Sequence, residues 1–293
     1  MRVFALSDIH IDYPDNMRWI QSLPAAEYRR DALLLAGDVT HHLGRLETAL
    51  GVLRERFAQV FYVIGNHEAW LIGGGFRDSL AKFERIMERC AALGIDTSPA
   101  KVGEDRDPVW VVPLFSWYVK PEEGPDSLYL PKEGEDPNLD VWADDHFVRW
   151  PRFDRHRGAA DFFAEMNRPH LERSYDAPVI SLSHFVPRSD LMFALDGARP
   201  PANASPSHRR FNFSRVAGAK SIEAQLRRLG STIHVYGHQH RNRYRRLDGV
   251  VYVSHCLGYV HERQRNESCY LNGAPKLIWD SLDPLAGRPP HEY

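Results

Sequence analysis

The chain has 293 residues, of which 43% are hydrophobic and 26% are charged, an ordinary balance for a globular protein. Its formal net charge of -2 excludes an overall basic field of the kind that attracts nucleic acid or an anionic membrane. No apolar run approaches the roughly 20 residues of a membrane-spanning helix, and the first run is interrupted by Asp8 before it could form a signal-peptide core. The three cysteines lack the spacing of a metal site or a disulfide framework. We therefore expect a cytoplasmic protein with reduced thiols, and neither nucleic acid nor a membrane among its partners.

The first third of the chain alternates between two kinds of segment. Short apolar runs at 3–6, 32–36 and 60–64 each end in turn and polar residues, which is typical of buried strands. Apolar residues with helical spacing fill 43–57 and 78–93. Alternating strands and helices predict an α/β fold.

Residues 116–157 interrupt this alternation. The segment is rich in Pro, Gly, Trp and acidic residues, and a stretch of this length without secondary structure is usually functional or disordered. Its many aromatic residues argue against disorder. We interpret it as an insertion packed over one face, which acts either as a lid over the substrate or as a structural cover. The whole chain, 1–293, is predicted to form a single domain that includes this insertion.

The alternation resumes after the insertion. The predicted elements, in chain order, are a helical segment at 158–175, a strand at 178–183, a loop at 187–213, a helix at 219–229, a strand at 232–236, hairpin strands at 243–247 and 250–254, and a last apolar run at 276–279.

Five of the strand-like runs end in side chains that commonly bind metals. These ends read Asp8-Ile9-His10, Gly37-Asp38, Gly65-Asn66-His67-Glu68, His184 and Gly237-His238-Gln239-His240. Mixed oxygen and imidazole ligands suit Mn, Fe or Zn better than Ca. Ligands bind at the carboxyl ends of strands in open α/β sheets, so all five ends are expected to meet in one crevice. The glycines before Asp38, Asn66 and His238 are expected to form tight turns.

These motifs, in this order, resemble those of the calcineurin-like metallophosphoesterase superfamily. Each motif alone is short and common, but all five in order, each after a strand-like run, are specific. They lie within 8–68 and 184–240, and the fourth place of Gly37-Asp38-Val39-Thr40 differs from members that carry Asp or Asn there. The resemblance implies two mixed β-sheets packed as a sandwich and flanked by helices, the αββα fold. It leaves the insertion and the C-terminal tail unexplained.

The resemblance also implies two divalent metal ions, Mn, Fe or Zn, in a dinuclear centre. The implied ligands of the first ion are Asp8, His10 and His240. The implied ligands of the second ion are Asn66, His184 and His238. Asp38 resembles the carboxylate that bridges the two ions, and His67 resembles the histidine that contacts the phosphate or protonates the leaving group.

This chemistry explains the residue types. Two metal ions about 3.5–4 Å apart can clamp a phosphate and activate a shared hydroxide. An imidazole with a pKa near neutrality can supply the proton that the leaving group needs. We therefore expect a metal-dependent phosphoesterase that hydrolyses a phosphomonoester or phosphodiester, with a small-molecule phosphate ester or nucleotide as substrate.

Two other functions remain open at this point. A nuclease of the same superfamily would need a long basic groove, which the net charge of -2 does not indicate. A non-catalytic protein-binding scaffold would have lost metal ligands, and here every ligand type is present. The preferred ester, the metal and the oligomeric state have no signal in the sequence.

Several residues have competing interpretations. Asp8 and Asp38 could instead cap the helices that follow them. His41 and His42 are expected at the surface or at a helix cap, with a role behind the metal ligands as the alternative. His255 could lie near the site or away from it.

Two further interpretations concern polar side chains outside the ligand set. Glu68 could fix the backbone of its turn or orient a ligand. Arg209 and Arg210 belong to a basic segment that could grip a phosphate, or simply face solvent.

Overall fold

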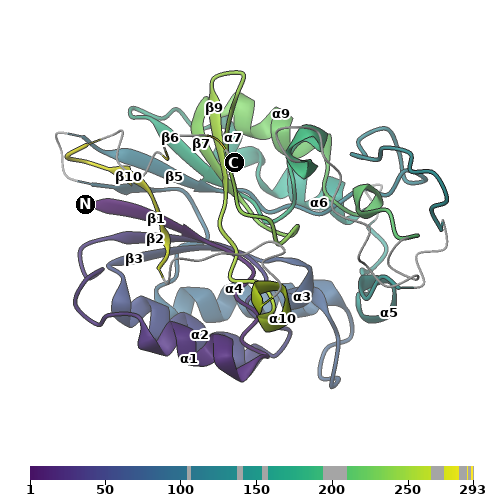
Figure 1. Cartoon of the computed structure of the whole chain (residues 1–293), viewed down its shortest axis with the longest axis horizontal. Coiled ribbons are helices and arrows are strands. Elements are labelled where there is room, and N and C mark those ends of the chain that lie inside the picture. Colours follow the sequence, from purple (N-terminus) through teal and green to yellow (C-terminus); the bar gives the residue numbers. More distant parts are fainter. Residues whose placement is uncertain are drawn as a thin grey trace.

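Two mixed β-sheets lie face to face between two layers of helices in the computed structural model (Figure 1). The structure describes residues 1–103, 107–136, 141–153, 158–193, 210–264, 274–283, 289 and 292. This arrangement confirms the predicted fold class. Among the described helices, none has the length and hydropathy to cross a membrane.

The first sheet has the strand order β10-β1-β2-β3. Its strands are β1 (Arg2–Leu6), β2 (Ala32–Ala36), β3 (Gln59–Val63) and β10 (Lys276–Asp280). β1, β2 and β3 run parallel, and β10 pairs antiparallel with β1. The chain therefore returns through β10 to the first sheet, and the single domain stays a prediction.

The second sheet has the strand order β4-β5-β6-β7-β9-β8. Its strands are β4 (Ala100–Val102), β5 (Val109–Pro113), β6 (Val179–Leu182), β7 (Ser231–Tyr236), β8 (Arg243–Leu247) and β9 (Val250–Ser254). β5, β6, β7 and β9 are parallel to one another, and the two outer strands are antiparallel to their neighbours. The central strands are buried because both faces are covered, and this explains why they form continuous apolar runs in the sequence.

Each sheet has its own layer of helices (Figure 1). On the first sheet lie α1 (Pro14–Ser22), α2 (Leu43–Arg56) and α4 (Ser79–Leu93). On the second lie α6 (Ala159–Met166), α7 (Arg168–Glu172) and α9 (Lys220–Arg228). The short helices α3 (Asn66–Ala69), α5 (Asp144–Phe147) and α10 (Val260–Gln264) belong to the loops at the strand ends.

The insertion is packed against the protein where the structure describes it. Trp117 and Tyr118 are buried, and the Trp117 ring lies edge-on to Trp150 at 4.9 Å and to Phe185 at 5.1 Å. Phe185 belongs to the loop that follows β6. The aromatic residues thus attach the insertion to the end of the second sheet.

His234, in the centre of β7, makes the stability of the fold sensitive to acid. Its ring is buried between the hydroxyls of Ser181, 2.8 Å from Nδ1, and Ser183, 3.0 Å from Nε2. Burial lowers the pKa of His234 to about 3, well below the ordinary value of 6.5. Between these pH values the unfolded chain binds a proton that the folded protein does not, so stability is present above pH 6.5 and falls as the pH drops towards 3.

We predict that His234→Gln reduces this acid sensitivity. The free energy of unfolding of the metal-free protein would be measured in urea from pH 7 to pH 4. The wild type should lose up to about 1.4 kcal/mol more per pH unit than the variant, because one protonation is removed. Equal slopes for the two proteins would contradict the prediction.

Candidate metal centre

The predicted ligands follow five parallel strands and meet at one edge of the two sheets. Asp8 and His10 follow β1, and Asp38 follows β2. The three other segments supply Asn66, His184, His238 and His240, which follow β3, β6 and β7. All seven side chains are buried.

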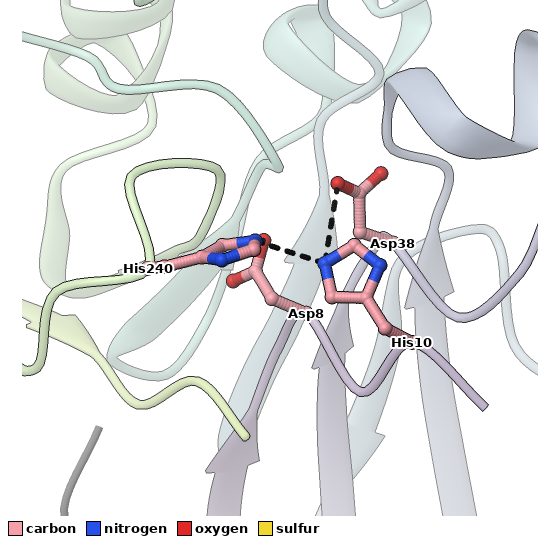
Figure 2. A group of neighbouring side chains, drawn as sticks. All are labelled: Asp8, His10, Asp38 and His240. Atoms are coloured by element: carbon pink, nitrogen blue, oxygen red, sulfur yellow. Dashed lines mark hydrogen bonds and ion pairs between the residues drawn. The ribbon is translucent and has the colours of Figure 1, made fainter. Parts of the chain in front are cut away.

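Asp8, His10, Asp38 and His240 form a first group whose candidate ligand atoms lie within 4.8 Å of one another (Figure 2). The Nε2 atoms of His10 and His240 are 2.8 Å apart. Nε2 of His240 is 3.6 Å from Oδ1 of Asp8, and Nε2 of His10 is 3.9 Å from Oδ2 of Asp38. The group therefore points two imidazole nitrogens and two carboxylates at a common space.

Asp38 also belongs to a second group, together with His184 and His238. Nε2 of His184 is 3.5 Å from Oδ2 of Asp38 and 3.2 Å from Nδ1 of His238. The carboxamide oxygen of Asn66 lies 3.2 Å from the same His184 nitrogen and 3.1 Å from Nδ1 of His238. The two groups thus share one carboxylate, Asp38.

Hydrogen bonds on the outer side of the rings decide which nitrogen faces the cluster. Nδ1 of His184 donates to the carbonyl of Ala36 at 2.8 Å, and Nε2 of His238 donates to the carbonyl of Val216 at 2.9 Å. A carbonyl oxygen can only accept, so the proton sits on these outer nitrogens. The inner nitrogen of each ring keeps its lone pair for a metal.

The backbone is strained at five of the predicted ligands. Residues with this left-handed conformation are Asp8 (φ 50°), His10 (φ 39°), Asp38 (φ 56°), His238 (φ 72°) and His240 (φ 52°). This conformation costs a residue with a side chain about 1–2 kcal/mol. Such strain gathers at functional sites, where the surrounding structure enforces it.

Of the three glycines expected in tight turns, only Gly37 has a left-handed backbone conformation. Gly37 has a positive φ of 78°, but Gly65 has a φ of −103° that any residue can adopt. A Cβ atom at Gly65 would clash with the Asp38 carboxylate, and one at Gly237 would lie 2.7 Å from Oδ2 of Asp8. Glycine is therefore needed at positions 65 and 237 because a side chain there would collide with the carboxylates of Asp38 and Asp8.

Glu68 joins the turns that carry Asp38 and Asn66. Its buried carboxylate accepts hydrogen bonds from four backbone N–H groups: Gly65 at 2.6 Å, Asp38 at 3.1 Å, Val39 at 2.6 Å and Thr40 at 3.2 Å. The role left open by the sequence is therefore to fix the backbone. Asp8 and Asp38 do not cap the helices that follow them, since the capping positions of α1 and α2 are Tyr13 and His42.

The electrostatics of the cluster fit bound cations. Burial raises the pKa of Asp38 well above its ordinary value, and the nearby carboxylates of Glu68 and Asp8 raise it further. Burial and the neighbouring imidazoles lower the pKa of His10 and His238 well below 6.5. Buried carboxylates beside neutral imidazoles form a donor set that divalent ions would stabilise.

His67 lies beside both groups. Its backbone N–H donates to Oδ1 of Asp38 at 3.0 Å, and its Nε2 is 3.8 Å from Oδ2 of Asp38. The ring stacks on Trp70 with centroids 3.7 Å apart. On its other side, the hydroxyl of Tyr259 is 3.5 Å from Nε2 of His67.

Only one of the two predicted substrate-binding arginines belongs to the described residues. Arg209 is outside them. Arg210 is exposed and forms an ion pair with Asp136 at 3.7 Å. Their contact with a phosphate stays a prediction.

The structure locates the three histidines whose roles the sequence left undecided. His41 is 3.4 Å from Asp12 through its Nδ1, and its ring packs on His42 with centroids 4.0 Å apart. His42 occupies the N-terminal capping position of α2, without a side-chain hydrogen bond to the helix. His255 is buried, and its Nε2 is 3.2 Å from the carbonyl of Ala274 in the polypeptide leading to β10.

Three residues that contact the cluster could not be identified from the sequence. Tyr259 packs on His10 and His240 with ring centroids 4.6 and 4.7 Å away. Glu262 of α10 holds Nδ1 of His240 through its Oε2 at 2.8 Å. Asp144 of α5 accepts a hydrogen bond from the Asn66 amide at 2.9 Å. Each comes from the insertion or the tail, which contain no recognisable motif.

We predict that Glu68→Gln destabilises the metal-free protein by about 2–4 kcal/mol, because several charge-assisted hydrogen bonds to buried N–H groups are lost. The free energy of unfolding in urea would measure this. Glu88→Gln is the matched control, because the Glu88 side chain is 65% exposed and only pairs with Arg85. Equal losses in the two variants would contradict the role assigned to Glu68.

We also predict that Glu262→Gln weakens the binding of one metal ion by about 10–100-fold, because His240 loses the carboxylate that fixes its ring. Stepwise titration of metal-free protein with Mn²⁺ would show one weakened and one unchanged affinity. Two unchanged affinities would show that Glu262 does not support the His240 ligand.

Comparison with known proteins agrees with this geometry. The model of the family described as calcineurin-like phosphoesterase matches residues 1–242. The acyl-carrier-protein phosphodiesterase PptH of Mycobacterium tuberculosis (strain ATCC 25618 / H37Rv) is 28% identical over 287 residues, which span 90% of this chain and 80% of the relative.

A solved structure shows the same fold. The crystal structure of the phosphopantetheinyl hydrolase PptH from Mycobacterium tuberculosis matches with a TM-score of 0.74 and 22% identity, over 98% of each chain. The family match covers most of the chain and includes all seven predicted ligands. The chain therefore belongs to the calcineurin-like phosphoesterase family and is a metal-dependent phosphoric ester hydrolase.

Proposed function

We propose that the chain hydrolyses a phosphodiester with two divalent ions held by the two side-chain groups. The first ion would bind Asp8, His10, Asp38 and His240. The second would bind Asp38, Asn66, His184 and His238. The observation that carries this proposal is that two groups of buried ligand atoms share the carboxylate of Asp38.

The bound ions would supply positive charge to the phosphate and lower the pKa of a water nucleophile. The protein's own contribution is to hold the ligand atoms before the substrate arrives. Hydrogen bonds from backbone N–H groups to Glu68 fix the turns, and those on the outer side of the rings fix the ring orientations. Little reorganisation is then needed during the reaction.

We assign the proton transfer to His67. Burial and neighbouring imidazoles lower its pKa well below 6.5, so the free ring is neutral and donates through one N–H. The negative charge of a phosphate ester would raise that pKa and favour the charged form. His67 would thus bind the substrate oxygen and give its proton to the departing alkoxide.

The aromatic side chains around the cluster support a diester over a monoester. Trp70 and Tyr259 lie next to His67, and Trp142 lies 5.8 Å from the ring of His238. Phe211 stacks on Trp142 at 5.4 Å. A phosphodiester carries an organic group on each side of the phosphorus, and aromatic surfaces provide contacts for both.

The relative suggests the substrate. PptH is named as an acyl-carrier-protein phosphodiesterase and as a phosphopantetheinyl hydrolase. We propose that this chain likewise cleaves the phosphodiester between a phosphopantetheinyl group and an acyl carrier protein. This replaces the small molecule or nucleotide expected from the sequence with a protein-bound substrate.

Hydrolysis assays with Mn²⁺ would test both parts. We predict turnover of bis(p-nitrophenyl) phosphate above that of p-nitrophenyl phosphate, and release of phosphopantetheine from holo-acyl carrier protein, followed by mass spectrometry. Asp38→Asn should lose at least about 100-fold in rate, because both ion sites lose their shared charge. Asp176→Asn is the matched control, because Asp176 is 70% exposed and pairs with Lys101.

The outcomes separate the reaction from the substrate. Preference for the monoester would refute the diesterase assignment. Diester turnover with an intact holo-acyl carrier protein would refute the substrate alone. Full activity of Asp38→Asn would refute the proposed dinuclear centre.

A further inference from the structure

Asp144 is a buried carboxylate that the insertion places beside the metal centre. It is the first residue of α5, and only 2% of its surface is exposed. It lies 78 residues from Asn66 along the chain and outside the five motifs. A buried carboxylate needs specific partners, since an unpaired one is strongly unfavourable.

One oxygen of Asp144 has two such partners. Oδ1 accepts a hydrogen bond from Nδ2 of Asn66 at 2.9 Å and another from Nε1 of Trp70 at 2.6 Å. Both donors belong to the segment that also carries His67. The insertion therefore contacts a proposed ligand and the residue that stacks on the proposed acid.

The bond to Asn66 determines which end of its amide faces the cluster. An asparagine side chain has a donor end and an acceptor end, and only the oxygen can bind a metal ion. Asp144 occupies the donor end, which leaves Oδ1 of Asn66 facing His184 and His238 at 3.2 and 3.1 Å. With the amide reversed, the NH₂ group would face the ion.

The hydrogen bond from Trp70 to Asp144 likewise affects the position of the His67 ring. The indole ring that donates to Asp144 stacks on the imidazole of His67 at 3.7 Å and an interplanar angle of 29°. Oδ1 of Asp144 thus also holds the Trp70 ring on which the imidazole of His67 stacks.

The support behind Asp144 is itself well anchored. The backbone of Leu71 donates to the carbonyl of Phe147 at 2.8 Å, and that of Ser79 donates to the carbonyl of Arg149 at 2.8 Å. Asp145, the next residue of α5, faces away to an ion pair with Lys120 at 2.5 Å. These contacts fix α5 on the segment between β3 and α4, so Asp144 is held in place by the fold.

We propose that Asp144 is a positioning residue that orients Asn66 for the second metal ion, so that the insertion forms part of the metal centre. This inference rests on the ligand role proposed for Asn66. It assigns to residues 142–149 a role in metal binding that neither a lid nor a structural cover would have.

Stepwise Mn²⁺ titration of the metal-free full chain would test the proposal. Asp144→Ala, which removes the acceptor of the Asn66 bond, should weaken the second ion by about 10–100-fold and leave the first within about twofold, the size of effect expected from a residue behind a ligand. Manganese electron paramagnetic resonance should then show loss of the signal of the paired ions at Mn²⁺ levels that fill the wild type. Asp145→Ala, the same change one residue on, should bind both ions as the wild type does.

Two further variants separate orientation from packing. Trp70→Phe keeps a ring on His67 and the bond between Asp144 and Asn66, so both ions should bind normally. The exchange Asn66→Asp with Asp144→Asn restores a donor facing an acceptor, with a carboxylate oxygen left for the metal. It should recover second-ion affinity at least about tenfold over Asn66→Asp alone, in which two carboxylates face each other, a coupling that only interacting residues show.

Each outcome decides the matter. Wild-type affinity for both ions in Asp144→Ala would overturn the proposal, as would an equal loss in Trp70→Phe, which would point to packing. Failure of the exchange to recover affinity over Asn66→Asp would also overturn it. A wild-type protein that binds fewer than two ions would overturn both the proposed function and this inference. A wild-type protein that binds two ions but does not cleave diesters would refute the proposed function alone, and the titrations would still test the role of Asp144.

Discussion

The site depends on one carboxylate that does not face the substrate. The Glu68 carboxylate accepts hydrogen bonds from four backbone N–H groups in two turns, and those turns carry Asp38 and Asn66. Backbone N–H groups at such turns would otherwise be buried without partners, at a cost of about 1–3 kcal/mol each. The same bonds set the separation between β2 and β3 at their ends, where Asp38 must reach both ligand groups. The geometry of the metal centre therefore begins with a structural hydrogen-bond network beneath it.

Much of this could be predicted from the sequence because the fold places its ligands in a regular way. Parallel strands covered on both faces form continuous apolar runs, so 32–36 and 250–254 match β2 and β9 in the structure. Each ligand follows such a run, and their order along the chain was enough to indicate the family. Two elements had weaker signals. α1 buries only Asn16 and Ile20, and the apolar run of β5 continues into 114–119 without a turn residue.

What could not be predicted depends on contacts between distant segments. Residues 116–157 contain many carboxylates, and nothing local distinguishes Asp144 from Asp145. The structure buries the first beside Asn66 and leaves the second at the surface with Lys120. The need for glycine at position 65 has a related cause. The requirement at Gly65 comes from the Asp38 side chain of another turn, and not from its own backbone angles.

The left-handed conformations at the predicted ligands have an evolutionary consequence. Strain at Asp8, His10, Asp38, His238 and His240 is present in the folded protein whether or not a substrate is turned over. A descendant freed from catalysis would gain stability by exchanging these residues for glycine, which adopts the same angles without steric cost. The side chains predicted to bind the metal ions are thus the ones that mutation would remove first once selection for activity ended. The presence of all five strained residues is therefore a sign, in the backbone conformation, of selection for activity.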